Sequence, residues 1–209
     1  LPLIPSRFAR TAENAVIHAR AIGYPVTVKL ASHTLIHKTE VGGVRLNLVD
    51  DAAVRDAFEA IRSRLAKDRR ADAMDGVFVQ PMVSDGVEVM AGMTRDLSFG
   101  PLLAFGLGGI YVDVLHDTQF RVTPITDRDA AEMVRGIKGY RLLEGYRGKP
   151  AADVKALEEI LLRLSQLVES VPEIAELDLN PIMALPGKQG CRIVDARIRV
   201  STFKTSSPR

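Results

Sequence analysis

A series of short apolar segments, separated by turn residues, places the strongest constraint on the fold of this chain. The segments lie between residues 76 and 123, and glycine, proline or aspartate interrupts the chain between them, as in the turn Ser84-Asp85-Gly86. Short strands that follow one another through tight turns pair mainly with their sequence neighbours. The pattern predicts a largely antiparallel sheet with strands at residues 76–82, 87–93, 102–105, 110–115 and 120–123.

Helical patterns and further strands flank this series. Thr11 can cap a helix that stops at Gly23, and Asp50 or Asp51 begins a second helix. A third helix is predicted at residues 127–137, and the clearest amphipathic stripe lies within residues 151–171. Strands are also predicted at 26–31, 174–180 and 191–200. The expected fold class is α+β, with a small lobe at residues 1–81, a larger lobe at 82–200 and a polar tail at 201–209.

Composition excludes several classes of protein. The chain has 28 lysines and arginines against 26 acidic residues, so its net charge of +2 gives no strong field for nucleic acid. Its single cysteine, Cys191, cannot form a disulfide within the chain, which favours a reducing, cytoplasmic compartment. No apolar stretch approaches the length of a membrane span. We therefore expect a cytoplasmic protein without nucleic-acid or membrane partners. The first residues, LPLIP, resemble the middle of a strand or turn, which suggests a piece of a larger protein.

Residues 23–47 bring together groups that suit a bound phosphate. Lys29 closes an apolar strand, His37 follows in a loop, and Gly42 and Gly43 are adjacent. A lysine at a strand end can place a positive charge beside a phosphate, and a glycine turn can present bare backbone N–H groups to it. Two other interpretations remain open: Lys29 can extend its charge to water, and a lone loop histidine is more often a surface residue.

A second glycine cluster and a set of oxygen ligands occur later in the chain. Residues 106–109 read Gly-Leu-Gly-Gly between two predicted strands, which fits either close approach of a ligand or a plain hairpin turn. Asp178 and Asn180 share one face of a predicted strand with Glu176, and Asp195 interrupts an apolar run on the next strand. If these strands pair, Asn180 and Asp195 can converge on Mg²⁺. The alternative is a solvated polar sheet face.

Seven segments together resemble the ATP-grasp region of the ADP-forming acyl-CoA synthetases. The resemblance runs in order from about residue 4 to residue 198, and differs where Glu40 replaces an aspartate and Leu97 a proline. It implies an ATP-grasp fold with ATP between two lobes. The segments are GYPVTVKL, SHTLIHKTEVGGVRLNL, VFVQPM, GVEVMAGMTRD, FGPLLAFGLGG, LLEGYRGKP and IAELDLNPIMALP.

The resemblance implies a role for each candidate residue. Lys29 would hold the nucleotide phosphates, while His37 would be a phosphohistidine that relays phosphoryl to a second histidine on the CoA-ligase part. Glu88 would face the ribose. Asn180 and Asp195 would bind Mg²⁺. The remaining ATP contacts would come from a mobile phosphate loop, the adenine hinge and a phosphate-side turn: Gly42, Gly43, Val79, Gln80, Pro81, Met82, Gly108 and Gly109.

The same resemblance implies the reaction and its partners. A complete enzyme of this family converts a carboxylic acid, CoA and ATP into acyl-CoA, ADP and phosphate, through acyl phosphate and phosphohistidine. The CoA-binding and ligase domains would lie on the same chain or on an α subunit. One alternative is a degenerate regulatory region of a GNAT-type lysine acetyltransferase. Another is a different carboxylate ligase of the ATP-grasp group, against which the His37 loop argues.

Overall fold

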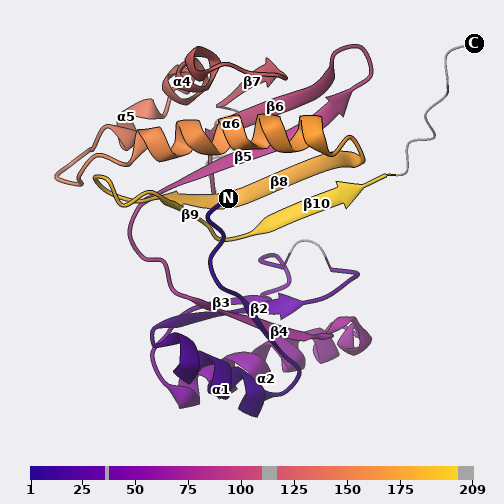
Figure 1. Ribbon diagram of the computed structural model, residues 1–209. Helices are drawn as coiled ribbons and strands as arrows, with labels where there is room; N and C mark the ends of the chain where they lie inside the picture. Colours follow the sequence, from indigo (N-terminus) through magenta and orange to yellow (C-terminus); the bar gives the residue numbers. More distant parts are fainter. Residues whose placement is uncertain (36–37, 110–116, 202–209) are drawn as a thin grey trace, which may run out of the picture. The chain divides into compact units, whose positions relative to one another are not determined.

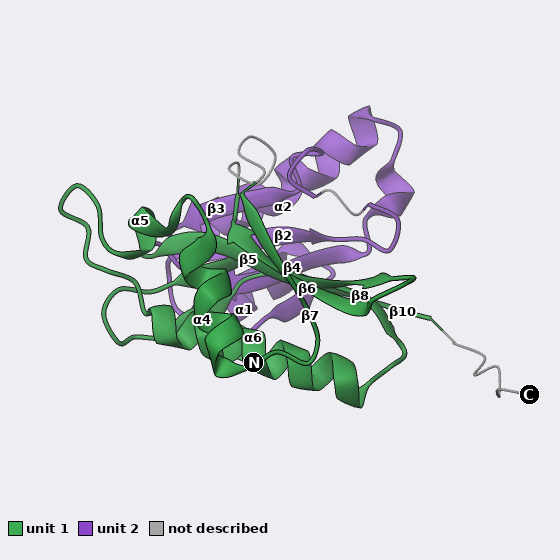
Figure 2. Ribbon diagram, turned by 90° about the horizontal axis from the view of Figure 1, so that it is seen from above, with its two compact units in different colours: residues 1–3, 85–209 green, residues 4–84 purple. Residues whose placement is uncertain are grey.

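Two compact units make up the protein in a computed structural model that describes residues 1–35, 38–109 and 117–201 (Figure 1). Unit 2 contains Ile4–Ser84, and unit 1 contains Leu1–Leu3 together with the chain from Asp85 onward (Figure 2). Unit 2 is therefore inserted in the sequence of unit 1, and the chain passes between the two units after Leu3 and again after Ser84.

Unit 2 is a four-stranded antiparallel sheet with two helices on one face (Figure 1). The helices pack on alternate residues of the two central strands, and Val26, Val28 and Val79 are completely buried there. The strand order is β1-β4-β2-β3. The elements are β1 Arg7–Ala9, α1 Ala12–Ile22, β2 Val26–Ala31, β3 Val44–Leu48, α2 Asp51–Lys67, the short 3-10 helix η1 Ala71–Ala73 and β4 Gly76–Pro81.

The predicted helix ends of unit 2 are confirmed. The Thr11 hydroxyl accepts a hydrogen bond from the Asn14 amide at 3.2 Å, and α1 ends at Gly23, whose φ of 93° suits a glycine. The Asp50 carboxylate accepts from the Ala53 amide at 2.8 Å and begins α2. Local side-chain chemistry thus sets these boundaries.

A polar cluster joins the end of α1 to the start of α2. Arg20 binds both carboxylate oxygens of Asp51, with Nε 3.0 Å from Oδ1, and the Tyr24 hydroxyl donates to the same Oδ1 at 2.7 Å. The hydrogen bonds from Arg20 and Tyr24 lower the pKa of Asp51 to about 2. Burial, followed by the bond to Asp51, raises the pKa of Tyr24 to about 12. The cluster favours an ionised Asp51 beside a neutral Tyr24.

We expect Asp51→Asn to weaken the acid sensitivity of unit 2. Because the pKa of Asp51 in the folded state is about 2, below its usual 3.8, its stabilisation is present above about pH 4 and is lost as the pH falls through 2. Urea unfolding at pH 7, 4 and 3 should show a less stable variant at pH 7, with a smaller loss of stability in acid. Asp56→Asn, an exposed change on the same helix, is the control, and equal behaviour of the two variants would contradict the expectation.

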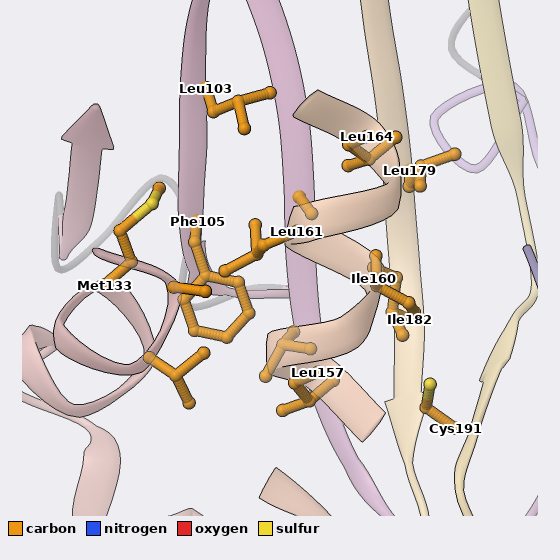
Figure 3. Close-up of a cluster of buried hydrophobic side chains, with 14 of the residues drawn as sticks. Leu103, Phe105, Met133, Leu157, Ile160, Leu161, Leu164, Leu179, Ile182 and Cys191 are labelled. Atoms are coloured by element: carbon orange, nitrogen blue, oxygen red, sulfur yellow. The ribbon is translucent and has the colours of Figure 1, made fainter. Parts of the chain in front are cut away.

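Unit 1 is a six-stranded antiparallel sheet in the order β10-β8-β5-β6-β7, with β9 paired to β8. Helices α4 and α6 pack on one face and enclose the larger core (Figure 3). Phe105 on β6 and Leu161 on α6 are both at most 1% exposed there. The elements are β5 Val87–Asp96, β6 Gly100–Leu107, β7 Thr118–Val122, α4 Asp127–Gly136, α5 Tyr140–Leu143, α6 Val154–Ser170, β8 Ile174–Ala184, β9 Cys191–Ile193 and β10 Ala196–Val200.

The predicted antiparallel pairing of consecutive strands is confirmed for β5, β6 and β7. The expectation that the strand at 76–82 belongs to the same sheet is wrong: β4 pairs with β1 and β2 in the sheet of unit 2, because the chain passes to unit 1 only after Ser84. The strand expected at residues 191–200 is divided into β9 and β10, because the chain leaves the ladder at Val194 and Asp195. The short elements β1, β3 and α5 were not predicted. The strand expected at 110–115 lies outside the described residues. No helix in the described part of the chain is long and apolar enough to cross a bilayer.

Candidate functional site

Lys29 lies on the face of the unit 2 sheet opposite the helices. All six residues of β2 are buried, and Lys29 itself is only 7% exposed. Since Val26, Val28 and Leu30 face the helices, Thr27 and Lys29 face the other way. Gln80 on β4, 8% exposed, is the register partner of Thr27 and shares this face. A buried cation and a buried amide thus stand on neighbouring strands.

The proposed adenine hinge lies beside the start of the same strand. Gln80 and Pro81 are in register with Thr27 and Val26, whereas β1 pairs with β4 only as far as Val79. The amide of Met82 donates to the Pro25 carbonyl oxygen at 3.0 Å, and the Thr27 hydroxyl contacts the Met82 sulfur at 3.2 Å. The structure therefore places Gln80, Pro81 and Met82 alongside the start of β2, the strand that carries Lys29.

The glycine turn after residue 37 has its amides occupied. The N–H of Gly42 donates to the Thr39 carbonyl at 3.0 Å, and that of Gly43 donates to the Lys38 carbonyl at 2.7 Å. A Cβ at Gly43 would lie 2.8 Å from Leu30 Cβ, so the turn also packs tightly on β2. The expectation of bare amides is wrong for this conformation, because the turn closes on its own carbonyls. His37 lies outside the described residues.

In unit 1, Glu88 meets the second glycine cluster across two neighbouring strands. The amide of Gly108 donates to the Glu88 carbonyl at 2.9 Å. Gly109 has a φ of 62°, and a Cβ there would strike the Glu88 carboxylate. Glycine is favoured at position 109 by its backbone conformation, and it leaves room for the carboxylate of Glu88, which a larger residue would displace.

Asn180 and Asp195 are also adjacent. The backbone N–H of Asn180 donates to the backbone carbonyl oxygen of Asp195 at 3.2 Å, where β8 passes the break between β9 and β10. The Asp195 side chain is 23% exposed, and Arg197 Nη2 lies 3.9 Å from its Oδ2. The pairing of β8 with β10 confirms the strand arrangement on which the predicted convergence of these two residues depends.

Asp178 is a further candidate metal ligand. The sequence placed it on the same face of the strand as Asn180, but it was not among the predicted ligands. It is half-buried, in register with Arg197 on β10 and Gly92 on β5. Burial raises the pKa of its carboxyl; Arg197 opposes the rise, and Asp195 and Glu176 add to it. Its alternation with Asn180 was the available signal. Perturbed carboxyls of this kind often mark functional sites.

The candidate metal ligands are few and all carry oxygen. Asn180, Asp195 and Asp178 supply amide and carboxylate oxygens, which suit Mg²⁺. Among the residues that the structure describes, no three His, Cys, Asp or Glu side chains are grouped so that they could hold a metal ion by themselves.

Comparison with known proteins defines the class. A family model described as an ATP-grasp domain matches residues 1–200. The acetate–CoA ligase [ADP-forming] I subunit beta of Pyrococcus furiosus is 43% identical, over 95% of this chain and 84% of that protein. The chain belongs to the ATP-grasp family represented by the β subunits of ADP-forming acetate–CoA ligases. Its fold is the expected α+β ATP-grasp fold.

Relatives of two kinds resemble the chain. The 4-hydroxybutyrate–CoA ligase [ADP-forming] of Nitrosopumilus maritimus is 44% identical over 95% of this chain, which spans only 28% of that protein. A dinucleotide forming acetyl-coenzyme A synthetase 1 from Ca. Korarchaeum cryptofilum, solved with coenzyme A and Ca-AMPCP, has a TM-score of 0.90 and 38% identity over 96% of this chain and 86% of that one. Another structure of that synthetase, with coenzyme A and Mg-AMPPCP, has a phosphohistidine segment pointing towards the nucleotide binding site. It has a TM-score of 0.80 and 38% identity over 96% of this chain and 85% of that one.

Proposed function

We propose that this chain is the ATP-binding, phosphoryl-transferring region of an ADP-forming acyl-CoA synthetase. The observation that carries the proposal is its 43% identity over 84% of the length of a β subunit of such a ligase. The complete enzyme would convert a carboxylic acid, CoA and ATP into acyl-CoA, ADP and phosphate. The relatives are named as ligases, which favours this function over a regulatory region of an acetyltransferase.

In this proposal each of the two units supplies its own groups to bind the nucleotide. Unit 2 contributes the Lys29 ammonium for the phosphates and backbone groups of residues 79–82 for adenine. Unit 1 contributes Glu88 for the ribose hydroxyls and Gly108-Gly109 for the phosphate side. The buried position of Lys29 supports its role, because burial strengthens the interaction of a cation with an anionic ligand.

Asn180 and Asp195 would hold Mg²⁺ in this site. Asp178 would be either a third oxygen ligand or a charged neighbour of the two ligands. Bound Mg²⁺ would neutralise charge on the transferring phosphates. The raised pKa of Asp178 supports its assignment, since a desolvated carboxylate beside Asp195 gains from a nearby cation. The protein's part is to place these oxygens on neighbouring strands, where the sheet fixes their spacing.

His37 would accept the γ-phosphoryl group and pass it to the CoA-ligating part of the enzyme. In this step the bond between the γ-phosphorus and the bridging oxygen breaks, a phosphorus–nitrogen bond forms, and ADP leaves with the bridging oxygen. A neutral imidazole can act as the nucleophile near neutral pH. For Gly42 and Gly43 to cover the phosphates, their amides would exchange the Thr39 and Lys38 carbonyls for phosphate oxygens.

Calorimetry with Mg·ATP tests the proposal on this chain. We expect one binding site with a dissociation constant in the millimolar range or tighter. Asp195→Asn should weaken binding by about 10-fold or more, because a charge-assisted contact is lost. Asp127→Asn, on the exposed first turn of α4, should bind as the unmodified protein does. Absence of binding at millimolar Mg·ATP would refute the nucleotide site, and unchanged affinity of Asp195→Asn would refute the metal assignment.

A further inference from the structure

We propose that residues 138–149 form the docking surface for the CoA-ligating part of the enzyme, and that carboxylates of this partner bind its arginines. The proposal rests on the proposed function. The segment, here the basic segment, runs from the end of α4 through α5 into the loop before α6. It contains four cations, Lys138, Arg141, Arg147 and Lys149, and one carboxylate, Glu144. Its charge thus exceeds the +2 of the whole chain.

The four cations are exposed, and none of them forms an ion pair with any residue that the structure describes. Other exposed arginines of the same unit behave differently: Arg128 pairs with Glu132 at 2.8 Å, and Arg163 pairs with Glu159. The basic segment therefore keeps its donors available, whereas the neighbouring helix surfaces neutralise theirs.

Tyr146 holds two of the cations in place. The Cζ atoms of Arg141 and Arg147 lie 5.7 Å and 5.4 Å from the centre of its ring, and Tyr146 is 41% exposed. At these distances both guanidinium groups are within the range of a cation–π attraction to the ring, and a planar guanidinium can bind a carboxylate through two parallel hydrogen bonds. The arrangement suits the recognition of a planar anionic group, such as a carboxylate, better than non-directional attraction between charges.

The backbone around Tyr146 is held in an uncommon conformation. Arg147 has a φ of 50°, which non-glycine residues rarely adopt, and Gly145 and Gly148 have φ values of 94° and 81°. The Lys149 amide donates to the Tyr146 carbonyl at 3.1 Å, and a Cβ at Gly145 would lie 2.8 Å from the Lys149 carbonyl oxygen. Such outliers persist where the surrounding structure fixes them, and they cluster at functional surfaces.

The basic segment begins beside the proposed phosphate-side glycines. The amides of Lys138 and Gly139 both donate to the buried Asp117 carboxylate at 2.7 Å. Gly139 also packs against the side chain of Leu107, which immediately precedes Gly108 and Gly109. Figure 1 shows the connection between α5 and α6 extending past this end of the six-stranded sheet. A partner that collects a phosphoryl group must reach the same end of unit 1.

A protein partner fits these features better than a free nucleotide does. Tyrosine and arginine are the residues that most often dominate protein interfaces, and here they are exposed and pre-arranged. Relatives of this chain occur both as a separate β subunit and within a much longer ligase, so a CoA-ligating surface exists for the chain to meet. Nucleotide phosphates are the competing ligand, and the experiment separates the two.

Association of this chain with the CoA-binding and ligase part of the same enzyme, supplied as a separate polypeptide, tests the proposal. Binding is measured at low and high salt for the unmodified chain and for Arg141→Ala/Arg147→Ala. We expect the double variant to bind the partner about 10-fold more weakly or worse, with a smaller salt dependence, and to keep its affinity for Mg·ATP. Arg128→Ala/Arg163→Ala removes the same charge from α4 and α6, and should bind normally.

Arg141→Lys/Arg147→Lys keeps the charge but loses the planar, two-pronged donors of the guanidinium, and should give an intermediate loss of partner affinity. Equal partner affinity of the alanine variant and the control would overturn the proposal. So would weaker Mg·ATP binding with unchanged partner association, which would assign the arginines to nucleotide phosphates. If the unmodified chain binds Mg·ATP but does not bind the partner, the docking proposal is overturned and the proposed nucleotide site is not. Failure of the unmodified chain to bind Mg·ATP would instead count against the proposed function.

Discussion

Lys29→Met is expected to weaken Mg·ATP binding by about 100-fold, because a charge-assisted hydrogen bond contributes about 1.5–3 kcal/mol and each 1.4 kcal/mol changes affinity about tenfold. Methionine keeps an unbranched apolar stem at this position of β2 and removes the ammonium group. Lys29 is 7% exposed, so water cannot easily replace its contact with a phosphate. Isothermal calorimetry of the variant at several Mg·ATP concentrations gives the ratio directly.

Lys67→Met is the matched control for this prediction. Lys67 is exposed in the last turn of α2 of the same unit, so its loss removes the same charge without touching the β2 face. Both variants should be compared by thermal unfolding before the titration. If Lys29→Met remains folded and binds Mg·ATP as tightly as the control does, Lys29 is not a phosphate ligand.

His37→Asn is expected to abolish phosphoryl transfer while leaving Mg·ATP binding intact. In the complete enzyme, γ-labelled ATP should place acid-labile label on this chain, because a phosphorus–nitrogen bond hydrolyses in acid. Asparagine has no nucleophilic nitrogen at neutral pH, so both the label and acyl-CoA formation should fall to background. The readouts are acid-labile radioactivity on the chain and the rate of acyl-CoA synthesis.

His33→Asn provides the control for a nonspecific loss of histidine. Its side chain is 94% exposed, and its Nε2 lies 3.7 Å from Asp75 Oδ2. This variant should label and turn over as the unmodified enzyme does. Retention of both label and turnover in His37→Asn would show that phosphoryl passes by another route.

Local chemistry explains which elements the sequence predicted well. The helices α1 and α2 begin at Thr11 and Asp50 because a side-chain oxygen there accepts an amide of the first turn. Helix α6 follows from its apolar stripe, which packs on the larger sheet. Strand β3 has no fully buried residue, and β1 has three residues, so neither gives a periodic signal.

The candidate site was predictable only in part. The sequence identified Asn180 and Asp195 and made their meeting conditional on strand pairing, which the structure confirms. It did not reveal that Asp178 becomes half-buried beside Arg197, because burial depends on the two neighbouring strands. Nor could it show that Gly42 and Gly43 donate to carbonyls of their own turn.

The sequence by itself determined the helix caps, the strand alternation and the placement of a lysine inside an apolar strand, because each depends on residues a few positions apart. Tertiary structure alone decided that Glu88 lies against Gly109, and that the Asp117 carboxylate binds the first two amides of the basic segment, those of Lys138 and Gly139. These contacts depend on strand register and on packing between distant segments. Such contacts form only when the whole unit buries its apolar face, so no local pattern encodes them.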